Sequence, residues 1–185
     1  QEKLYPTVLC EELHGQQVLI VGYGDIGRAI EARLLPFGVE IVRVARRARE
    51  GVYGVEKLMD LLPAADVVIL IVPFTSETTC MIGVEQIARM KRGALLVNAA
   101  RGPVVDTDAL VAALHERRIQ AAIDVTDPEP LPDGNPLWSA PNLLITPHIA
   151  GSTSMFMRRA MEFAAAQVGR YLRGEPLENQ VIDEY

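Results

Sequence analysis

Short apolar runs recur along this chain and alternate with stretches of helical spacing, and this alternation restricts the fold more than any other feature. The runs consist mainly of Val, Ile, Leu and Ala, as in strands that are covered on both faces. They are residues 16–22, 40–45, 65–72, 94–100, 119–125 and 142–146. Helical spacing is found in residues 26–35, 55–61, 84–90 and 106–115. This order predicts an α/β fold, a doubly wound parallel sheet flanked by helices.

The composition restricts the partners and the location of the protein. The 185 residues are 49% hydrophobic and 23% charged, which is typical of one globular domain with a sizeable core. The net charge of −6 argues against a nucleic-acid partner, and the longest apolar run is far shorter than the roughly 20 residues of a membrane span. Cys10 and Cys80 are too few for a disulfide framework and too isolated for a zinc site. We therefore expect no metal and a reducing cytoplasm.

Two proline-rich segments and one long helix complete the expected organisation. Residues 127–141 contain several prolines and polar residues, and residues 73–78 begin with Pro73 and are otherwise mainly polar, so we expect no regular structure in either segment. Residues after His148 have helical spacing, with Ser152 or Thr153 as the expected cap and Gly174 as the expected stop.

A glycine motif lies where the first expected strand meets the first expected helix. Gly22, Gly24 and Gly27 fit the pattern G-x-G-x-x-G, with Asp25 and Ile26 opening the helix. In a Rossmann-type sheet the first glycine allows a tight turn, the second lets the backbone approach a pyrophosphate, and the third lets helix and strand pack closely. The helix adds unpaired N–H groups that attract phosphate. This context predicts a dinucleotide site, although a glycine-rich turn without a ligand remains an alternative.

The second expected strand ends without the acidic residue that an NAD site usually has about 20 residues after the glycines. Ala45 falls near that position, and Arg46 and Arg47 follow it, with Arg43 and Arg49 close by. A guanidinium pairs well with a 2′-phosphate, so this segment favours NADP(H), with NAD(H) as the second choice. The alternative is a solvated surface loop.

Arg101, Glu129 and His148 are the candidates for catalysis, because each follows the end of an expected strand. Ligands of open α/β sheets bind at that edge. Taken singly, each has an ordinary explanation: a surface arginine, a loop glutamate and a histidine whose hydrogen bonds are satisfied.

Together with the glycine motif, these residues lie in segments that resemble the D-isomer-specific 2-hydroxyacid dehydrogenase family. The segments are GYGDIG, VPFTSETTCMIG, NAARGPVVDTDALVAAL, DVTDPEPLPDGNPLW and TPHIAG, and they occur in the order typical of the family. The resemblance implies hydride transfer between a nicotinamide and C2 of a small 2-oxo or 2-hydroxy acid. It also implies a homodimer.

The same resemblance implies a role for each candidate. Arg101 holds the carboxylate and carbonyl oxygen of the substrate, His148 moves the proton, and Glu129 fixes the imidazole. Asp124 bonds the nicotinamide carboxamide. The remaining cofactor contacts are expected at Val72, Pro73, Ala99, Ala100 and Gly151.

Two departures from the family pattern lead to further expectations. Ala45 replaces the usual Asp, which favours NADP(H). Only residues 1–15 precede the strand that leads into the glycine motif, so we expect residues 1–185 to be one nucleotide-binding domain of a longer protein. In that arrangement residues 1–15 lead in from a substrate domain and residues 152–185 form a helix and a tail. Alone, such a domain is expected to bind NADPH and to turn over 2-oxo acids poorly. A non-catalytic nucleotide sensor or co-repressor of the same fold, and a structural module without ligand, remain the alternatives.

Overall fold

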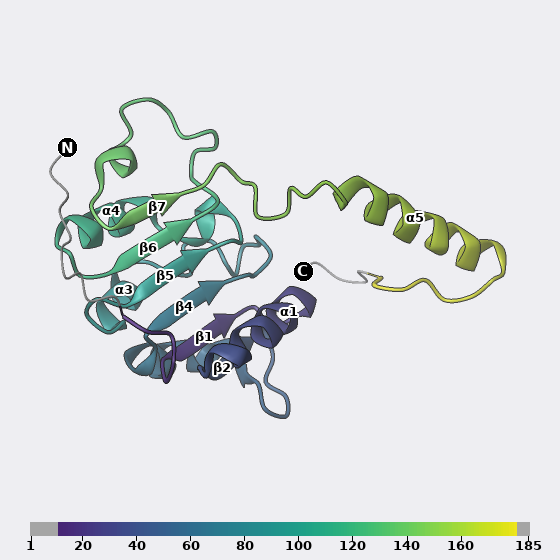
Figure 1. The fold of residues 1–185 in the computed structure, drawn as a ribbon, viewed down its shortest axis with the longest axis horizontal. Coiled ribbons are helices and arrows are strands. Elements are labelled where there is room, and N and C mark those ends of the chain that lie inside the picture. The colour runs from purple at the N-terminus through teal and green to yellow at the C-terminus, as the bar shows by residue number, and fades with distance from the viewer. Residues whose placement is uncertain (1–10, 181–185) are drawn as a thin grey trace, which may run out of the picture.

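The computed structural model describes residues 11–180, and its body is a seven-stranded sheet in which all paired strands are parallel (Figure 1). The strand order is β3-β2-β1-β4-β5-β6-β7. The strands are β1 (Gln17–Val21), β2 (Glu40–Ala45), β3 (Tyr53–Gly54), β4 (Val67–Leu70), β5 (Leu95–Asn98), β6 (Gln120–Ile123) and β7 (Leu143–Ile145). The chain runs outward from β1 to β3 and then returns to the other side of β1, so the order reverses between β1 and β4. This arrangement confirms the doubly wound Rossmann-type sheet, and in such sheets ligands bind where the strand order reverses.

Helices and single helical turns connect the strands. The α-helices are α1 (Asp25–Leu34), α2 (Leu58–Leu61), α3 (Val84–Arg89), α4 (Thr107–His115) and α5 (Phe156–Leu172). The 3-10 turns are η1 (Leu35–Phe37), η2 (Val55–Lys57), η3 (Leu62–Ala64), η4 (Gly102–Val104) and η5 (Pro136–Ser139). At the start of α4 the side chain of Asp106 accepts a hydrogen bond from the backbone N–H of Ala109, which is a normal N-cap.

The sheet buries a core on each face, as the continuous apolar runs predict. Leu19 and Val21 of β1 belong to the larger core, which includes side chains of α2, α3 and α4. Val18 and Ile20 point to the opposite face and pack with Ile30 of α1. Successive side chains of a strand face opposite ways, so a strand covered on both sides must be apolar throughout. Because the sheet is packed on both faces, the positions of its strand ends are fixed, and the loops that follow them are held in place.

Three local expectations were wrong. The segment expected as one helix over residues 55–61 is a 3-10 turn followed by a single α-helical turn, and Pro63 then opens a further 3-10 turn. The proline-rich segment 127–141 contains η5, whose first turn is capped by Asn135. The last helix begins at Phe156 without a side-chain cap, because Ser152 and Thr153 take part in backbone turns instead. Gly174 ends that helix with a φ of 68°, as expected.

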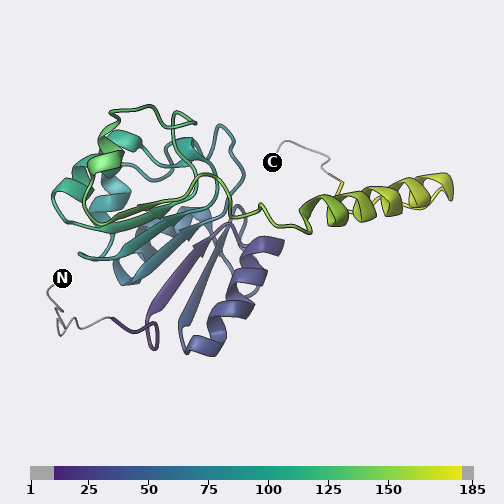
Figure 2. The ribbon, with the colours of Figure 1, turned by 45° about the horizontal axis from the view of Figure 1, so that its top comes forward.

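The helix α5 stands apart from the sheet in two views (Figures 1 and 2). None of its residues is buried, and apolar side chains such as Met161 and Leu172 are more than half exposed. No helix within residues 11–180 is both long and apolar enough to cross a membrane. The described residues include only the last part of the expected lead-in over residues 1–15. Cys10 and the end of the expected tail lie outside them.

Candidate active site

The glycine motif forms the turn that joins β1 to α1. Gly22 has a φ of 107°, and a Cβ at this position would lie 2.5 Å from the carbonyl oxygen of Ile71. A Cβ on Gly27 would lie 2.8 Å from the carbonyl oxygen of Gly22. Both glycines are therefore required by the protein itself, because a side chain would collide with backbone that cannot move. These contacts agree with the expected tight turn and the expected close packing of helix and strand.

Gly24 differs from its two neighbours in the motif. A Cβ on Gly24 would meet no atom within 4 Å, and its φ of −101° is open to any residue. Gly24 is the N-cap of α1, so the unpaired N–H groups of that helix begin here. The missing side chain leaves space at the positive end of the helix, which is where a pyrophosphate fits. The backbone of this turn thus suits the phosphates of a dinucleotide.

A cavity of about 600 Å³ opens beside this turn, at the reversal of the strand order. Of the expected cofactor contacts, its walls contain Gly22, Gly24, Ala45, Arg46, Arg47, Val72 and Pro73. They also contain Thr75, Glu77 and Thr78, from the segment after β4, which the sequence analysis did not single out as site residues. The other expected contacts do not line it: Asp25, Ile26, Gly27, Ala99, Ala100, Asp124 and Gly151. The cavity is large enough for a nucleotide and is partly open to solvent.

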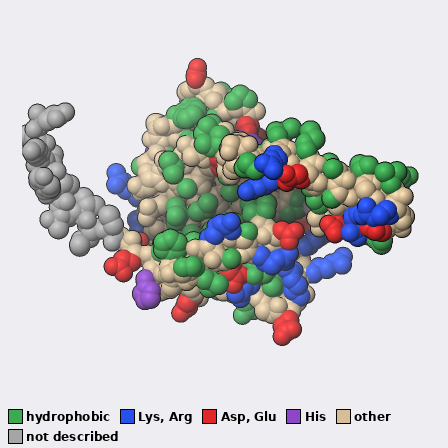
Figure 3. Space-filling model, turned by 45° about the vertical axis from the view of Figure 1, so that its right-hand side comes forward, with side chains coloured by type: hydrophobic (Ala, Val, Ile, Leu, Met, Phe, Trp, Pro, Cys, Tyr) green, Lys and Arg blue, Asp and Glu red, His purple; other side chains and the backbone are tan. Residues whose placement is uncertain are grey.

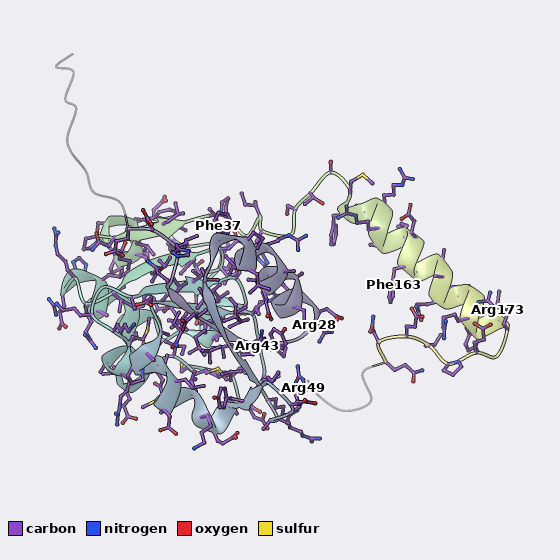
Figure 4. All side chains as sticks on the ribbon, turned by 60° about the horizontal axis from the view of Figure 1, so that its bottom comes forward. Arg28, Phe37, Arg43, Arg49, Phe163 and Arg173 are labelled. Atoms are coloured by element: carbon purple, nitrogen blue, oxygen red, sulfur yellow. The ribbon has the colours of Figure 1, made fainter. Side chains whose placement is uncertain are left out.

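The arginines near the end of β2 have different roles. The guanidinium of Arg43 donates to the buried carboxylate of Glu31 in α1, with an Nε–Oε2 distance of 2.8 Å. This interaction, with a hydrogen bond from the Tyr23 hydroxyl, holds the pKa of Glu31 below its ordinary value despite burial. Arg49 donates to the carbonyl oxygen of Tyr23 and lies over its ring. Figure 4 shows Arg43 and Arg49 on the same side of the molecule as α1.

Arg46 and Arg47 line the cavity, and neither is hydrogen-bonded to the glycine turn by an interaction like that of Arg49. Arg46 Nη2 lies 2.7 Å from Glu77 Oε1. The strand β2 ends at Ala45, and the residues that follow it directly are Arg46 and Arg47, so no acidic residue lies at this strand end. Figure 3 shows basic side chains with acidic side chains among them on one face of the molecule.

His148 and Glu129 form a pair beyond the ends of β7 and β6. Nδ1 of His148 lies 2.6 Å from Oε1 of Glu129, and both side chains are about half exposed. His148 has a φ of 53°, and its backbone N–H donates to the carbonyl oxygens of Asp124 and Thr146. A carboxylate on one ring nitrogen fixes which nitrogen is available for proton transfer.

Asp124 holds the loop that carries His148. Its carboxylate accepts hydrogen bonds from the Thr146 hydroxyl and from the backbone N–H groups of Ile149 and Ala150, at 2.5 to 2.9 Å. Burial acts to raise the pKa of Asp124, but these hydrogen bonds outweigh it and the pKa is lowered. The expected contact to a carboxamide would use the remaining acceptor capacity of this carboxylate.

Arg101 follows β5, on the same edge of the sheet as the other two candidates. Asn98 at the end of β5 is buried and donates to the carbonyl oxygen of Arg101, 3.0 Å away. A second cavity of about 380 Å³ is lined by Asp124, Glu129, Trp138 and His148, among others, and Arg101 is outside this lining. Within residues 11–180 no group of His, Cys, Asp and Glu side chains is arranged to hold a metal ion.

Comparisons with known proteins identify the family. A family model described as "D-isomer specific 2-hydroxyacid dehydrogenase, NAD binding domain" matches residues 2–150. The chain belongs to the D-isomer-specific 2-hydroxyacid dehydrogenase family. Relatives of this family carry the names of dehydrogenases and reductases.

Three similar members illustrate the range of the family. A glyoxylate reductase from Thermofilum pendens is 42% identical over 171 residues, which are 89% of this chain and 50% of the relative. A D-isomer-specific 2-hydroxyacid dehydrogenase from Xanthobacter autotrophicus, solved with NADPH and MES, superposes with a TM-score of 0.85 at 37% identity, covering 96% of this chain and 75% of that one. An NADPH-dependent glyoxylate/hydroxypyruvate reductase from Sinorhizobium meliloti was solved with NADP and sulfate. It superposes with a TM-score of 0.88 at 26% identity, covering 96% of this chain and 59% of that one. The chain spans about half the length of the curated relatives it matches, or less.

Proposed function

We propose that this chain is the cofactor-binding domain of a dehydrogenase that uses NADP(H) to transfer a hydride to or from C2 of a small 2-oxo or 2-hydroxy acid. One observation supports this most directly. The open backbone at Gly24 and the paired His148 and Glu129 lie at the same edge of one parallel sheet. That arrangement suits a pyrophosphate and an acid–base pair on one side of the domain.

The residues of the chain have separate tasks in this proposal. The nicotinamide supplies or accepts the hydride. His148 gives a proton to the carbonyl oxygen when a 2-oxo acid is reduced and takes it back in the reverse reaction. Glu129 accepts from Nδ1 of the imidazole, which leaves Nε2 for the proton transfer to the substrate. Arg101 binds the substrate carboxylate with charge-assisted hydrogen bonds.

The end of β2 supports NADP(H) as the preferred cofactor. Ala45 has no side-chain oxygen for a ribose hydroxyl, whereas Arg46 and Arg47 line the adenosine end of the cavity. A guanidinium can hold a 2′-phosphate through two parallel hydrogen bonds. The Xanthobacter and Sinorhizobium relatives were solved with NADPH and NADP, which supports the same choice.

The location and assembly of the protein belong to the same proposal. We expect it in a reducing cytoplasm, where Cys80 stays an exposed free thiol. We expect a homodimer by resemblance to the family. The extent of the domain, residues 1–185, is also part of the proposal.

Cofactor titration tests the first half of the proposal. The change Ala45→Asp with Arg46→Ala restores a carboxylate at the end of β2 and removes a cation. We expect the ratio of NADPH to NADH affinity to fall by roughly tenfold to a hundredfold, because a charged hydrogen bond is worth about 1.5–3 kcal/mol. Nucleotide fluorescence measures both affinities. An unchanged ratio would mean that the arginines only solvate a surface loop.

Turnover tests the second half. In the full-length protein that contains this domain, His148→Asn removes the proton donor and keeps a hydrogen-bonding side chain. We expect turnover of glyoxylate or hydroxypyruvate to fall by roughly 10²- to 10⁴-fold with NADPH binding unchanged. Stopped-flow absorbance at the nicotinamide band measures the rate. Turnover that survives the change would assign the proton transfer to another group.

A further inference from the structure

We propose that Glu77 is a second determinant of cofactor choice, which competes with the 2′-phosphate of NADP(H) for the guanidinium of Arg46. The inference rests on the proposed function, since it concerns the same adenosine end of the cavity. It assigns to Glu77 the effect of limiting the preference for NADP(H) over NAD(H).

The ion pair that carries this inference lies in the lining of the cavity. Arg46 follows β2, whereas Glu77 lies in the segment after β4, and both line the cavity beside the glycine turn. Their Nη2 and Oε1 atoms are 2.7 Å apart. The pair thus connects two walls that are separated by β1 in the sheet. An adenosine 2′-phosphate that approached Arg46 would meet the carboxylate of Glu77.

A hydrogen-bonded turn fixes the position of Glu77. The buried hydroxyl of Thr78 donates to the carbonyl oxygen of Pro73, 2.7 Å away, and accepts from the backbone N–H of Thr75, 2.8 Å away. The backbone N–H of Thr79 also donates to the carbonyl oxygen of Thr75. The residue before Thr78 is therefore presented to the cavity by an ordered backbone.

The exposure of the pair decides how it behaves. The side chains of Arg46 and Glu77 are 52% and 58% exposed, so their attraction is screened by water. A phosphate with its larger charge can displace such a carboxylate from the guanidinium. The carboxylate then stays close to the phosphate and repels it. With NAD(H) the ribose hydroxyl brings no charge, and the Arg46–Glu77 pair persists. Glu77 therefore weakens the binding of NADP(H) and leaves that of NAD(H) nearly unaffected.

The experiment compares Glu77→Gln with the parent 185-residue chain in titrations with NADPH and with NADH. Glutamine keeps the shape and removes the charge. We expect NADPH to bind roughly threefold to tenfold more tightly, and NADH to change by less than about twofold, because an exposed ion pair and an exposed contact between like charges each have a small effect. Glu50→Gln is the matched control, since Glu50 is an exposed acid near the arginines that does not line the cavity. Circular dichroism verifies that each variant is folded.

The outcomes separate this inference from the proposed function. A parent chain that binds neither nucleotide overturns both. A parent that binds NADPH, with an unchanged ratio of affinities in Glu77→Gln, overturns only the role of Glu77. The same result follows if Glu50→Gln tightens NADPH binding equally, because the effect would then be one of net charge.

The double variant tests whether Glu77 acts through Arg46. In the Arg46→Ala background, Glu77→Gln has no guanidinium to release, so we expect less than half of the fold-change seen in the parent. An equal fold-change in both backgrounds would overturn the competition for Arg46.

Discussion

At the scale of single residues, the glycines of the motif make separable contributions to folding and binding. In Gly22→Ala the new Cβ would lie 2.5 Å from the carbonyl oxygen of Ile71 at a φ of 107°, so we expect a loss of more than about 1 kcal/mol of stability. In Gly24→Ala the Cβ meets no protein atom, so stability should change by less than about 1 kcal/mol. The same Cβ would occupy the space for a phosphate, so NADPH binding should weaken at least roughly tenfold. Thermal melts without ligand and NADPH titrations separate the two effects. If Gly24→Ala bound NADPH normally, the phosphates of the cofactor would have to bind at another place in the cavity.

Residues of the site differed in how far the sequence predicted them. The glycine motif is local, so its spacing alone indicated the turn and the helix start. Glu77 carries no such signal, because it is brought to Arg46 by the return of the chain to β4 and not by its neighbours in the sequence. The sequence also did not predict which of the four arginines near the end of β2 bind other residues of the protein and which line the cavity. Arg43 binds Glu31, a buried residue of α1, instead of lining the cavity, and that contact depends on how α1 packs on β2.

At the scale of elements, the contact between Glu31 of α1 and Arg43 of β2 should affect stability. The Arg43 guanidinium lowers the pKa of Glu31 from its ordinary value of 4.5. A carboxyl group with a lowered pKa in the folded state stabilises that state above pH 4.5, and the effect is lost as the pH falls through the lowered pKa. We expect Glu31→Gln to cost roughly 1.5–3 kcal/mol at pH 7, the range for charged hydrogen bonds. Urea unfolding at pH 7 and at pH 3 measures this, and the difference from the parent should shrink at pH 3.

The control for this prediction is Asp25→Asn. Asp25 also pairs with an arginine, Arg28, but both of these side chains are mostly exposed. Exposed pairs contribute little, so we expect a change below about 1 kcal/mol at either pH. Equal effects of the two changes would show that the burial of Glu31 is unimportant.

Elements were predictable where many residues share one pattern. Strands β1, β2 and β4 to β7 fall within the apolar runs because they contribute apolar side chains to the two cores of the sheet. The two-residue β3 was missed, since a strand this short has no periodicity and depends on its pairing with Val44 and Ala45. The start of α5 was placed too early because Ser152 and Thr153, although good capping residues, belong to turns that follow the His148 loop.

At the scale of the whole molecule, the sheet and its covering helices should fold without α5. All of the buried apolar residues of the described chain precede residue 138, and α5 has no buried residue. Figure 4 shows Phe163 and Arg173 well away from the body of the protein.

We expect a chain that ends at residue 153 to melt within about 2 °C of the parent, because less than about 0.5 kcal/mol of the stability of the sheet depends on the removed segment. Differential scanning calorimetry measures this, and NADPH should raise both melting temperatures equally, since no residue of α5 lines the nucleotide cavity. A drop of several degrees would mean that α5 packs against the sheet in solution.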